Sequence, residues 1–250
     1  MPHHRVILEG LHAAPVGTRL CVEGEEAHHA IRVKRLEAGD VVEVLNGRGL
    51  RVSGKIAATH KLGKHGWQME IDATRSETEP RDERLEVFAA AAKGERLEEM
   101  VESLSQIGVS LFRPLLTERT VVDPREGKLA RLSRIALESI KQCGRSWPIQ
   151  IGEAITLREA LRSQSGVTIC AADASGGSPS LKNTPERVVL LVGPEGGWSP
   201  AEFKVLTDAG VTLQNFGPHI MRVETAAVVG AGILSTLLRP GVHSPHQAKS

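Results

Sequence analysis

The sequence predicts an α/β fold preceded by a smaller β-rich segment, and three observations support this. Between residues 5 and 72, short apolar runs of strand length follow one another, separated by glycine, proline and asparagine turn signals. From Leu85 onward, apolar runs alternate with segments whose apolar residues recur every three or four positions, the period of a helix. At residues 188–202, a continuous β-branched run, a glycine-rich loop and a helix start follow directly on one another.

The composition is that of a globular protein with a substantial core. The chain has 250 residues, of which 40% are hydrophobic and 24% charged, which suits one large domain or two smaller ones. The formal net charge is only +1, so a nucleic-acid surface would have to be a local patch. With four Phe, three Trp and no Tyr, binding through many stacked bases is not expected.

The cysteines and the N-terminus point to a reducing compartment. Cys21, Cys143 and Cys170 are odd in number and far apart, which argues against a disulfide framework and against a zinc site. The first residues lack the apolar core of a signal peptide, and no apolar run reaches the roughly 18 residues that a membrane span needs. We therefore expect a cytoplasmic protein with no metal and no membrane partner.

The N-terminal segment, residues 1–73, is expected to form a small β-barrel. A helical insert at 25–36 interrupts it and bears Arg32, Lys34 and Arg35 with no acidic residue between His28 and Arg35. This cluster suits either phosphate contact or a solvated helix face. Seven of the ten histidines lie in the same segment, but without ligand pairs at metal spacing we expect them to be solvated. Strands are expected at 5–8, 19–22, 41–45, 51–57 and 67–71.

Residues 74–84 are polar apart from one proline and are expected to be an interdomain linker. Residues 85–240 then form the α/β domain, and residues 241–250, which lack an apolar pattern, are expected to be a disordered tail. In the 124–143 helix, Arg125, Lys128, Arg131 and Arg134 recur every three residues, as on a basic ridge or a solvated face. Strands are expected at 85–90, 111–115, 167–171, 188–192 and 211–216, and helices at 94–107, 124–143, 200–209 and 224–238.

The glycine-rich loop is the strongest single feature of the α/β part. It runs from Gly193 to Trp198 and follows an uninterrupted apolar strand, as expected of a strand buried on both faces. Ser199 can cap the next helix and Glu202 completes a capping box. The loop is neither a dinucleotide fingerprint nor a P-loop, so it is either a tight structural turn or a ligand loop. With the second glycine–proline junction at 217–224 and Asp173 after a third strand, it can form one crevice.

The chain resembles the RsmE family of ribosomal RNA methyltransferases, in the SPOUT superfamily. Four segments of the sequence carry this resemblance, and a few residues near the N-terminus add to it. The N-terminal match consists of His29, Arg32 and Gly39-Asp40, and the likeness covers residues 3 to 239. Gln106 and Pro218-His219 depart from the usual family residues. The four segments are Lys93-Gly94-Glu95-Arg96 with Glu98 and Glu102, Glu138-Ser139-Ile140-Lys141-Gln142-Cys143-Gly144-Arg145, Gly193-Pro194-Glu195-Gly196-Gly197, and Arg222-Val223-Glu224-Thr225-Ala226.

The resemblance implies a PUA-like, RNA-binding β-barrel followed by a SPOUT-type α/β methyltransferase domain with a C-terminal trefoil knot. It also implies a homodimer that uses S-adenosyl-L-methionine to methylate N3 of a uridine in 16S ribosomal RNA, free or within the small ribosomal subunit. Two rivals remain open: a SPOUT enzyme acting on transfer RNA or on a ribose 2′-oxygen, and a non-catalytic RNA-binding protein of the same fold.

The resemblance also implies roles for individual residues. Catalytic positions are Arg222, Glu224 and Thr225. Cofactor-binding positions are Leu191, Val192, Gly193, Pro194, Glu195, Gly196, Gly197, Phe216, Gly217, Ile220, Met221 and Thr225. RNA-binding positions are His29, Arg32, Arg35, Lys93, Arg96, Arg119, Lys141, Gln142 and Arg145.

The chemistry of uridine N3 limits what these residues must do. N3 carries a weakly acidic proton on the pairing edge, so the base must be unstacked and the proton removed or the anion stabilised. An arginine near the uracil carbonyls stabilises the anion. Glu195 or Glu224 can act as base or as hydrogen-bonding scaffold; scaffold is favoured because an arginine neighbour keeps a carboxylate's pKa low. His219 is either a base or a solvent-facing loop residue.

Overall fold

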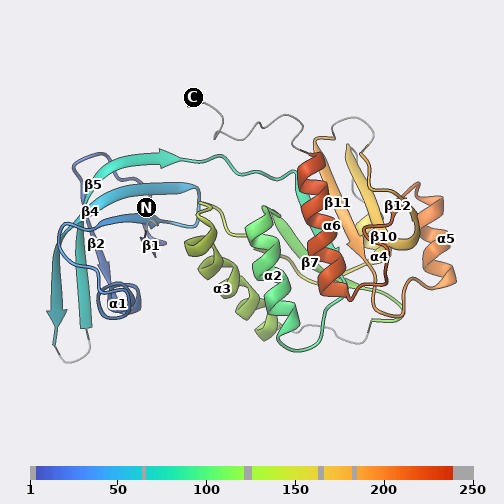
Figure 1. Ribbon diagram of the computed structural model, residues 1–250, viewed down its shortest axis with the longest axis horizontal. Coiled ribbons are helices and arrows are strands. Elements are labelled where there is room, and N and C mark those ends of the chain that lie inside the picture. Colours follow the sequence, from blue (N-terminus) through green and yellow to red (C-terminus); the bar gives the residue numbers. More distant parts are fainter. Residues whose placement is uncertain (1–3, 64–65, 121–125, 163–165, 182–184, 239–250) are drawn as a thin grey trace. The chain divides into compact units, whose positions relative to one another are not determined.

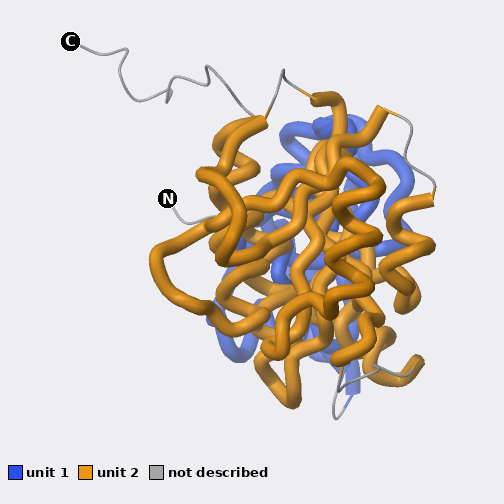
Figure 2. The backbone as a smooth tube through the Cα atoms, turned by 90° about the vertical axis from the view of Figure 1, so that its right-hand side faces the viewer, with its two compact units in different colours: residues 1–81, 137–148 blue, residues 82–136, 149–250 orange. Residues whose placement is uncertain are grey.

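The computed structural model describes residues 4–63, 66–120, 126–162, 166–181 and 185–238. The expected tail at 241–250 and Arg125 lie outside these ranges. The chain forms two compact units, coloured separately in Figure 2. Unit 1 comprises residues 1–81 and 137–148, and unit 2 comprises residues 82–136 and 149–250. The N-terminal unit therefore includes a segment from the middle of the chain, which differs from the division at 74–84 that the sequence suggested.

Unit 1 is built on a five-stranded sheet with the order β1-β3-β4-β5-β2, in which β1 pairs with β3 in parallel and the other pairs are antiparallel. Its core contains alternate residues of these strands, such as Val42, Val44 and Val52, all fully buried. That alternation places one face of the sheet in this core. On the other face, Glu43 and Leu45 of β3 are also buried. The strands are β1 (His4–Ile7), β2 (Arg19–Glu23), β3 (Val41–Leu45), β4 (Leu50–Leu62) and β5 (Gly66–Thr78).

Strands β4 and β5 are each 13 residues long, longer than the apolar pattern predicted. The end of β5, residues 74–78, is exposed, so pairing with β4 holds it in the sheet without an apolar anchor. The first part of the expected linker is therefore strand. The register shifts near Gly54, where an added Cβ would lie 2.7 Å from the Asp72 carbonyl oxygen. A β-bulge with a glycine at the point of close backbone approach is a common way for a strand to bend.

The helical insert is two short pieces rather than the single helix expected at 25–36. Helix α1 (Gly24–His28) continues into a π-helix, η1 (His29–Val33). The Leu36 amide then donates to the Ala30 carbonyl at 3.1 Å. Ala27, Ala30 and Leu36 are buried against the unit 1 core, so the basic side chains of the insert remain on its exposed face.

The C-terminal part of helix α3 (Glu126–Cys143) belongs to unit 1. Arg5 Nη1 donates to the carbonyls of Lys141 (2.9 Å) and Gln142 (3.2 Å), which otherwise lack intrahelical partners at the end of a helix. Lys141 Nζ donates to Glu26 Oε1 at 2.7 Å and also pairs with Glu138. Ile140 packs with residues of β1 and β3. The basic residues near this helix end therefore fasten it to the sheet.

Unit 2 is built on a parallel sheet whose order is β12-β10-β11-β6-β7-β8, with β9 also paired to β7. Strand β10 extends to Gly177, beyond the predicted end at 171, because its far end pairs with β12 after a register shift. The strands are β6 (Leu85–Ala89), β7 (Leu111–Leu116), β8 (Gln150–Ile151), β9 (Ile155–Thr156), β10 (Val167–Gly177), β11 (Arg187–Val192) and β12 (Thr212–Gln214).

Strand β11 is buried on both faces, as its sequence predicted. Val188, Leu190 and Val192 pack with residues of helices α2 and α6, whereas Val189 and Leu191 pack with residues of α4 and α5. Helices α2 and α6 lie side by side (Figure 1). These helices are α2 (Arg96–Ile107), α4 (Leu157–Arg162), α5 (Pro200–Asp208) and α6 (Val223–Leu237).

Small residues let α6 approach the sheet closely. Gly230 is buried, and a Cβ at this position would lie 2.8 Å from Leu190 Cδ2 and 3.4 Å from the Phe216 ring. The three cysteines are free thiols, consistent with their spacing. Burial raises the pKa of Cys170 to about 12, so this thiol stays protonated and unreactive at neutral pH.

The contacts of Arg5 predict a large stability effect in unit 1. Arg5 Nε donates to Glu43 Oε2 at 2.7 Å, and Glu43 is 6% exposed. Arg5→Met should lower the free energy of unfolding by about 3 kcal/mol, because it leaves a buried carboxylate poorly paired and helix carbonyls without donors. Urea denaturation followed by circular dichroism measures this change.

Arg19→Met is the matched control, because Arg19 pairs with Asp72 at an exposed position of the same sheet. It should leave the urea midpoint nearly unchanged. Equal effects of the two substitutions would contradict the anchoring role of Arg5.

Candidate functional site

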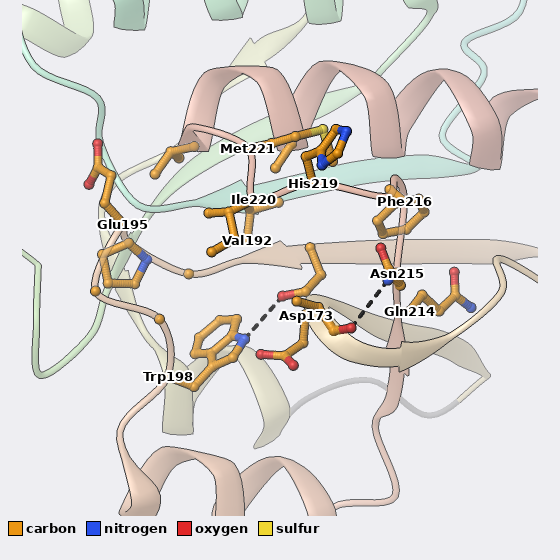
Figure 3. A pocket seen from close by; sticks show the side chains of 18 residues that line it. Asp173, Val192, Glu195, Trp198, Gln214, Asn215, Phe216, His219, Ile220 and Met221 are labelled. Carbon is orange, nitrogen blue, oxygen red and sulfur yellow. Dashed lines mark hydrogen bonds between the residues drawn. The ribbon is translucent and has the colours of Figure 1, made fainter.

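The outer part of β10 and the loops that follow its two parallel neighbours, β11 and β12, line a cavity of about 290 Å³ in unit 2 (Figure 3). This volume is close to the lower end of the roughly 300–1,000 Å³ range of small-ligand pockets. Residues 172–174 come from the outer part of β10, residues 193–198 follow β11, and residues 214–216 and 219–221 come from the end of β12 and the loop after it. Val223 and Ala226 of α6 complete the wall. The crevice predicted from the two glycine–proline junctions and Asp173 is therefore present.

The glycine loop is held by its own backbone and by one indole. The Gly197 amide donates to the Pro194 carbonyl at 2.8 Å, and Gly197 has φ +68°, a conformation that favours glycine. Trp198 Nε1 donates to the Ala172 carbonyl at 3.2 Å, which ties this loop to β10. A Cβ on Gly193 would lie 3.0 Å from the indole, so a side chain there would have to displace the Trp198 ring by a few tenths of an ångström.

The capping box predicted at the start of α5 is confirmed and does more than cap the helix. Ser199 Oγ accepts from the Glu202 amide at 3.1 Å, and Glu202 Oε2 accepts from the Ser199 amide at 2.8 Å. The other carboxylate oxygen of Glu202 accepts from the Glu118 amide at 2.9 Å. Arg119 Nη1 donates to the Gly196 carbonyl. The loop after β7 is therefore attached to the glycine loop.

The loop after β12 forms the opposite wall of the cavity. Asn215 Nδ2 donates to the Ala174 carbonyl at 3.2 Å and the Asn215 amide donates to the Gly177 carbonyl at 2.8 Å. In Figure 3, His219 and Met221 lie on one side of the cavity and Trp198 and Asp173 on the other. The walls thus combine apolar surface with two carboxylates, of Asp173 and Glu195, and the imidazole of His219.

Two polar side chains around the cavity keep unused acceptors. Gln214 lines it and donates from Nε2 to the Ser180 carbonyl at 2.7 Å, while its buried Oε1 has no hydrogen-bond partner among the described residues. Glu224, between Val223 and Ala226 on the first turn of α6, likewise has a buried Oε2 without such a partner. Its Oε1 lies 3.7 Å from Arg96 Nη1. A buried acceptor without a donor is costly, so a bound donor would stabilise either group.

Most of the predicted cofactor residues line the cavity, but three do not. Leu191 points into the core on the α4 and α5 side of the sheet. Gly217 lies within the loop and its amide donates to Asn215 Oδ1 at 3.0 Å, while Thr225 is exposed on α6. The residues that do line it are Val192, Gly193, Pro194, Glu195, Gly196, Gly197, Phe216, Ile220 and Met221.

Sequence reasoning did not assign several wall residues to the cofactor site. Asp173 was expected at the crevice, as the residue after a third strand, but was not assigned to the cofactor. His219 was considered as a base or as a solvent-facing loop residue, and not as a cofactor contact. The carboxyl ends of parallel strands share one edge of a sheet. In the sequence, the residues near the ends of the strands now labelled β10 and β12 could therefore have been predicted to line the cavity. The residues added by the structure are Ala172, Asp173, Ala174, Trp198, Gln214, Asn215, His219, Val223 and Ala226.

The predicted catalytic and RNA-contacting residues are divided between the units. In unit 2, Arg222 is exposed at the N-cap of α6, and Lys93, Arg96 and Arg119 are exposed. In unit 1, His29, Arg32 and Arg35 are exposed on the helical insert. Lys141 pairs with Glu26, Gln142 is exposed at the end of α3, and Arg145 is half-buried.

The predicted basic ridge of α3 is partly neutralised. Arg131 Nη2 lies 2.8 Å from Glu98 Oε2, and Lys128 pairs with the other oxygen of the same carboxylate. The hydrogen bond from Lys128 lowers the pKa of Glu98, and the charges of Lys128 and Arg131 act in the same direction. Arg134 stays exposed.

The described residues contain neither a group of metal-binding side chains nor a membrane-spanning helix. Within those ranges, no three His, Cys, Asp or Glu side chains are grouped so as to hold a metal ion. In the same part of the chain, no helix is both long and apolar enough to cross a bilayer.

Among known proteins, the chain is similar to RNA methyltransferases along nearly its whole length. The family model for the RNA methyltransferase domain matches residues 79–235, and that for the RNA methyltransferase PUA domain matches residues 22–63. A ribosomal RNA small subunit methyltransferase E of Synechocystis is 30% identical over 222 residues, covering 85% of this chain and 71% of the relative. Its counterpart in Bacillus subtilis is 25% identical, covering 86% and 88%.

Two solved structures share the fold. A ribosomal RNA small subunit methyltransferase E from Neisseria gonorrhoeae, bound to S-adenosyl methionine, has a TM-score of 0.81 at 23% identity, covering 94% of this chain and 98% of the other. The methyltransferase Lpg2936 from Legionella pneumophila, also in complex with that cofactor, has a TM-score of 0.79 at 24% identity, covering 94% and 97%. Because both family models match and the Synechocystis relative is 30% identical, the chain belongs to the ribosomal RNA small subunit methyltransferase E family.

Proposed function

We propose that this protein uses S-adenosyl-L-methionine to methylate N3 of a uridine in 16S ribosomal RNA. The observation that supports this best is the cavity between the glycine loop after β11 and the loop after β12, in a chain of this family. Relatives carry the name of a ribosomal RNA small subunit methyltransferase, and two proteins of the same fold were solved with the cofactor.

The residues present suit this cofactor. Gly193, Gly196 and Gly197 line the cavity and carry no side chain of their own, so a ligand can approach their main chain, which suits hydrogen bonds to the ribose and the amino-acid end. Phe216 and Met221 supply apolar surface for the adenine. The Asp173 carboxylate lines the same cavity and favours a ligand that carries an ammonium and a sulfonium.

In the reaction, the cofactor supplies a methyl group that leaves sulfur as a new bond forms to uridine N3, and the N3 proton is released. The target base must first leave its stack, since N3 lies on the pairing edge. Arg222, exposed at the start of α6, would stabilise negative charge on the uracil oxygens. The sequence favoured a scaffold role for both Glu195 and Glu224. Because Glu224 has a buried oxygen without a described donor, we instead assign Glu224, rather than the exposed Glu195, to accept the N3 proton.

Three further parts of the proposal concern the whole chain. A trefoil knot in the C-terminal part would keep the loops at 193–198 and 215–221 together, which their shared cavity supports. A cytoplasmic homodimer is the state that we propose for the working enzyme. In unit 1, the exposed residues His29, Arg32, Arg35 and Gln142 would contact RNA, with Lys141 and Arg145 beside Gln142 at the end of α3. In unit 2, the exposed residues Lys93, Arg96 and Arg119 would do so.

The central test is transfer of a radiolabelled methyl group from S-adenosyl-L-methionine to small ribosomal subunits from a strain that lacks the modification. We expect label in 16S RNA, recovered as 3-methyluridine after nuclease digestion and chromatography. Label in transfer RNA, or in a ribose-methylated nucleoside, would instead favour another SPOUT activity. No transfer to any RNA together with no cofactor binding would overturn the proposal.

Cofactor binding should depend on bare main chain in the glycine loop. A Cβ on Gly196 would lie 3.2 Å from Arg119 Cδ, so Gly196→Val must displace Arg119 and occupy the space along the loop. We expect at least a roughly 10-fold weaker Kd for S-adenosyl-L-methionine by isothermal titration, equivalent to about 1.4 kcal/mol. Gly232→Ala, at a helix position with no neighbour within 4 Å, should bind like the wild type. Normal affinity of the Gly196 variant would place the cofactor elsewhere.

Arg222 should affect methyl transfer more than cofactor binding. Arg222→Ala removes a guanidinium from the edge of the cavity without removing a packed core residue. We expect kcat to fall by roughly 100-fold or more, as when one stabilising donor is lost, with the cofactor Kd unchanged. Arg158→Ala, an exposed position on α4, is the control for loss of charge. An unchanged kcat would refute the role of Arg222.

Glu224 and Glu195 should differ as candidate proton acceptors. Glu224→Gln keeps the shape but not the basicity, so kcat should fall by roughly 100-fold or more, while Glu195→Gln should remain near wild type. Single-turnover rates across a range of pH separate the two variants. If Glu224→Gln instead lowers the melting temperature and keeps its rate, the carboxylate is a scaffold and not the acceptor.

A further inference from the structure

One tryptophan in unit 1 is surrounded by basic side chains. The guanidinium carbon of Arg32 lies 5.6 Å from the centroid of the Trp67 ring, and Lys61 Nζ lies 5.9 Å from it. The His28 ring is tilted by 47° to the indole at a centroid distance of 6.4 Å. Trp67 itself is half-buried against the unit 1 core, which fixes the ring in position. These four residues, His28, Arg32, Lys61 and Trp67, are named here the Trp67 cluster.

The cations of the Trp67 cluster are not neutralised by carboxylates. Among the described residues, neither Arg32 nor Lys61 forms an ion pair with an acidic side chain, and both are exposed. Other cations of unit 1 do have acidic partners, as Arg5 does with Glu43 and Arg19 with Asp72. An aromatic face attracts a cation but leaves its charge available to an anion. The cluster therefore holds two charges close together at one ring.

The backbone that presents Arg32 is also unusual. Arg32 lies in the π-helix η1. The π-helix is rare in proteins as a whole, but where it occurs it is often at a functional site. Three residues later, Arg35 has φ +58°, the only positive φ of a residue other than glycine in the described part of the chain. Such conformations persist when other interactions compensate for them and often mark binding sites. Here they keep Arg32, Lys34 and Arg35 exposed on one short segment.

We propose that the Trp67 cluster binds one unpaired nucleotide of an RNA, with the base against the indole and the adjoining phosphates at Arg32 and Lys61. A fixed indole suits the flat face of a base, and two unneutralised cations suit phosphates. A duplex keeps its bases stacked inside, so the cluster should favour a single strand. This rests on the proposed function in that the RNA substrate would supply the strand, but the cluster is separate from the cofactor cavity.

The probe is a fluorescein-labelled single-stranded oligouridylate of about 12 nucleotides, with the matching RNA duplex as comparison, and binding is measured by anisotropy at several salt concentrations. The full-length wild type should bind the single strand more tightly. Trp67→Leu should weaken that binding roughly 5- to 100-fold and change duplex binding little. Arg32→Gln and Lys61→Gln should each reduce the slope of log affinity against log salt by about 0.7.

Two further variants keep the test decisive. Trp67→Phe keeps an aromatic ring and should recover part of the lost affinity, which a folding defect in Trp67→Leu would not allow. Arg19→Gln removes a carboxylate-paired cation from the same sheet and should leave the salt slope unchanged. Wild-type affinity of Trp67→Leu, or equal slopes for Arg32→Gln and Arg19→Gln, would overturn the inference. The inference would also be overturned if the protein bound an acidic peptide at the Trp67 cluster and did not bind the single-stranded RNA.

A titration with S-adenosyl-L-methionine distinguishes failure of this inference from failure of the proposed function. The cofactor cavity is lined only by unit 2 residues, so Trp67→Leu should bind the cofactor like the wild type. If the wild type binds no cofactor but the variants behave as expected with RNA, the proposed function fails and the cluster stands. If the cofactor binds and Trp67→Leu binds RNA normally, only the inference fails.

Discussion

The common direction of β10, β11 and β12 is the constraint on which the site depends. Parallel strands end at one edge of the sheet, so the residues that follow them must meet there. Hydrogen bonds then fix how the loops meet: Trp198 donates to the Ala172 carbonyl and Asn215 to the Ala174 carbonyl. Without the parallel pairing, the glycine loop would be a turn with nothing facing it. The sequence left open whether the loop is a structural turn or a ligand loop, and this convergence supports the ligand loop that we propose.

The walls of the cavity are held by buried polar contacts rather than by apolar packing alone. Glu202 is 6% exposed, and its carboxylate accepts two hydrogen bonds, from the amides of Ser199 and Glu118, which lie in two different loops. Its own amide donates to Ser199 Oγ at the cap of α5. A carboxylate at this depth is tolerated because its oxygens are hydrogen-bonded at a helix N-terminus. Glu224 and Gln214 differ in keeping a buried oxygen without a described donor, which is why we relate them to ligands and not to the fold.

Basic residues in this chain have two physical roles that their sequence pattern does not separate. Lys141 and Arg5 are paired or hydrogen-bonded where α3 joins the sheet of unit 1, so they stabilise structure. Arg32 and Lys61 lie beside an indole without acidic partners among the described residues, so their charge remains available. In the sequence, Arg32 and Lys141 were both expected to bind RNA through the family resemblance, and nothing in their local pattern separated them. The distinction depends on which carboxylates the fold brings near, and those are distant in the sequence.

The sequence alone determined what short-range chemistry controls. The buried strand at 188–192, the capping box of Ser199 and Glu202, and the helices whose apolar residues recur at helical spacing all follow from neighbouring residues. The tertiary structure decided what distant residues control: the length of β5, the π-helix, the assignment of 137–148 to unit 1, and the cavity walls at Asp173, Trp198 and Asn215. Arg5 and Lys141 are separated by 136 positions, and no local pattern contains their contact. Propensity and capping act over one or two helical turns, whereas pairing and burial depend on the whole fold.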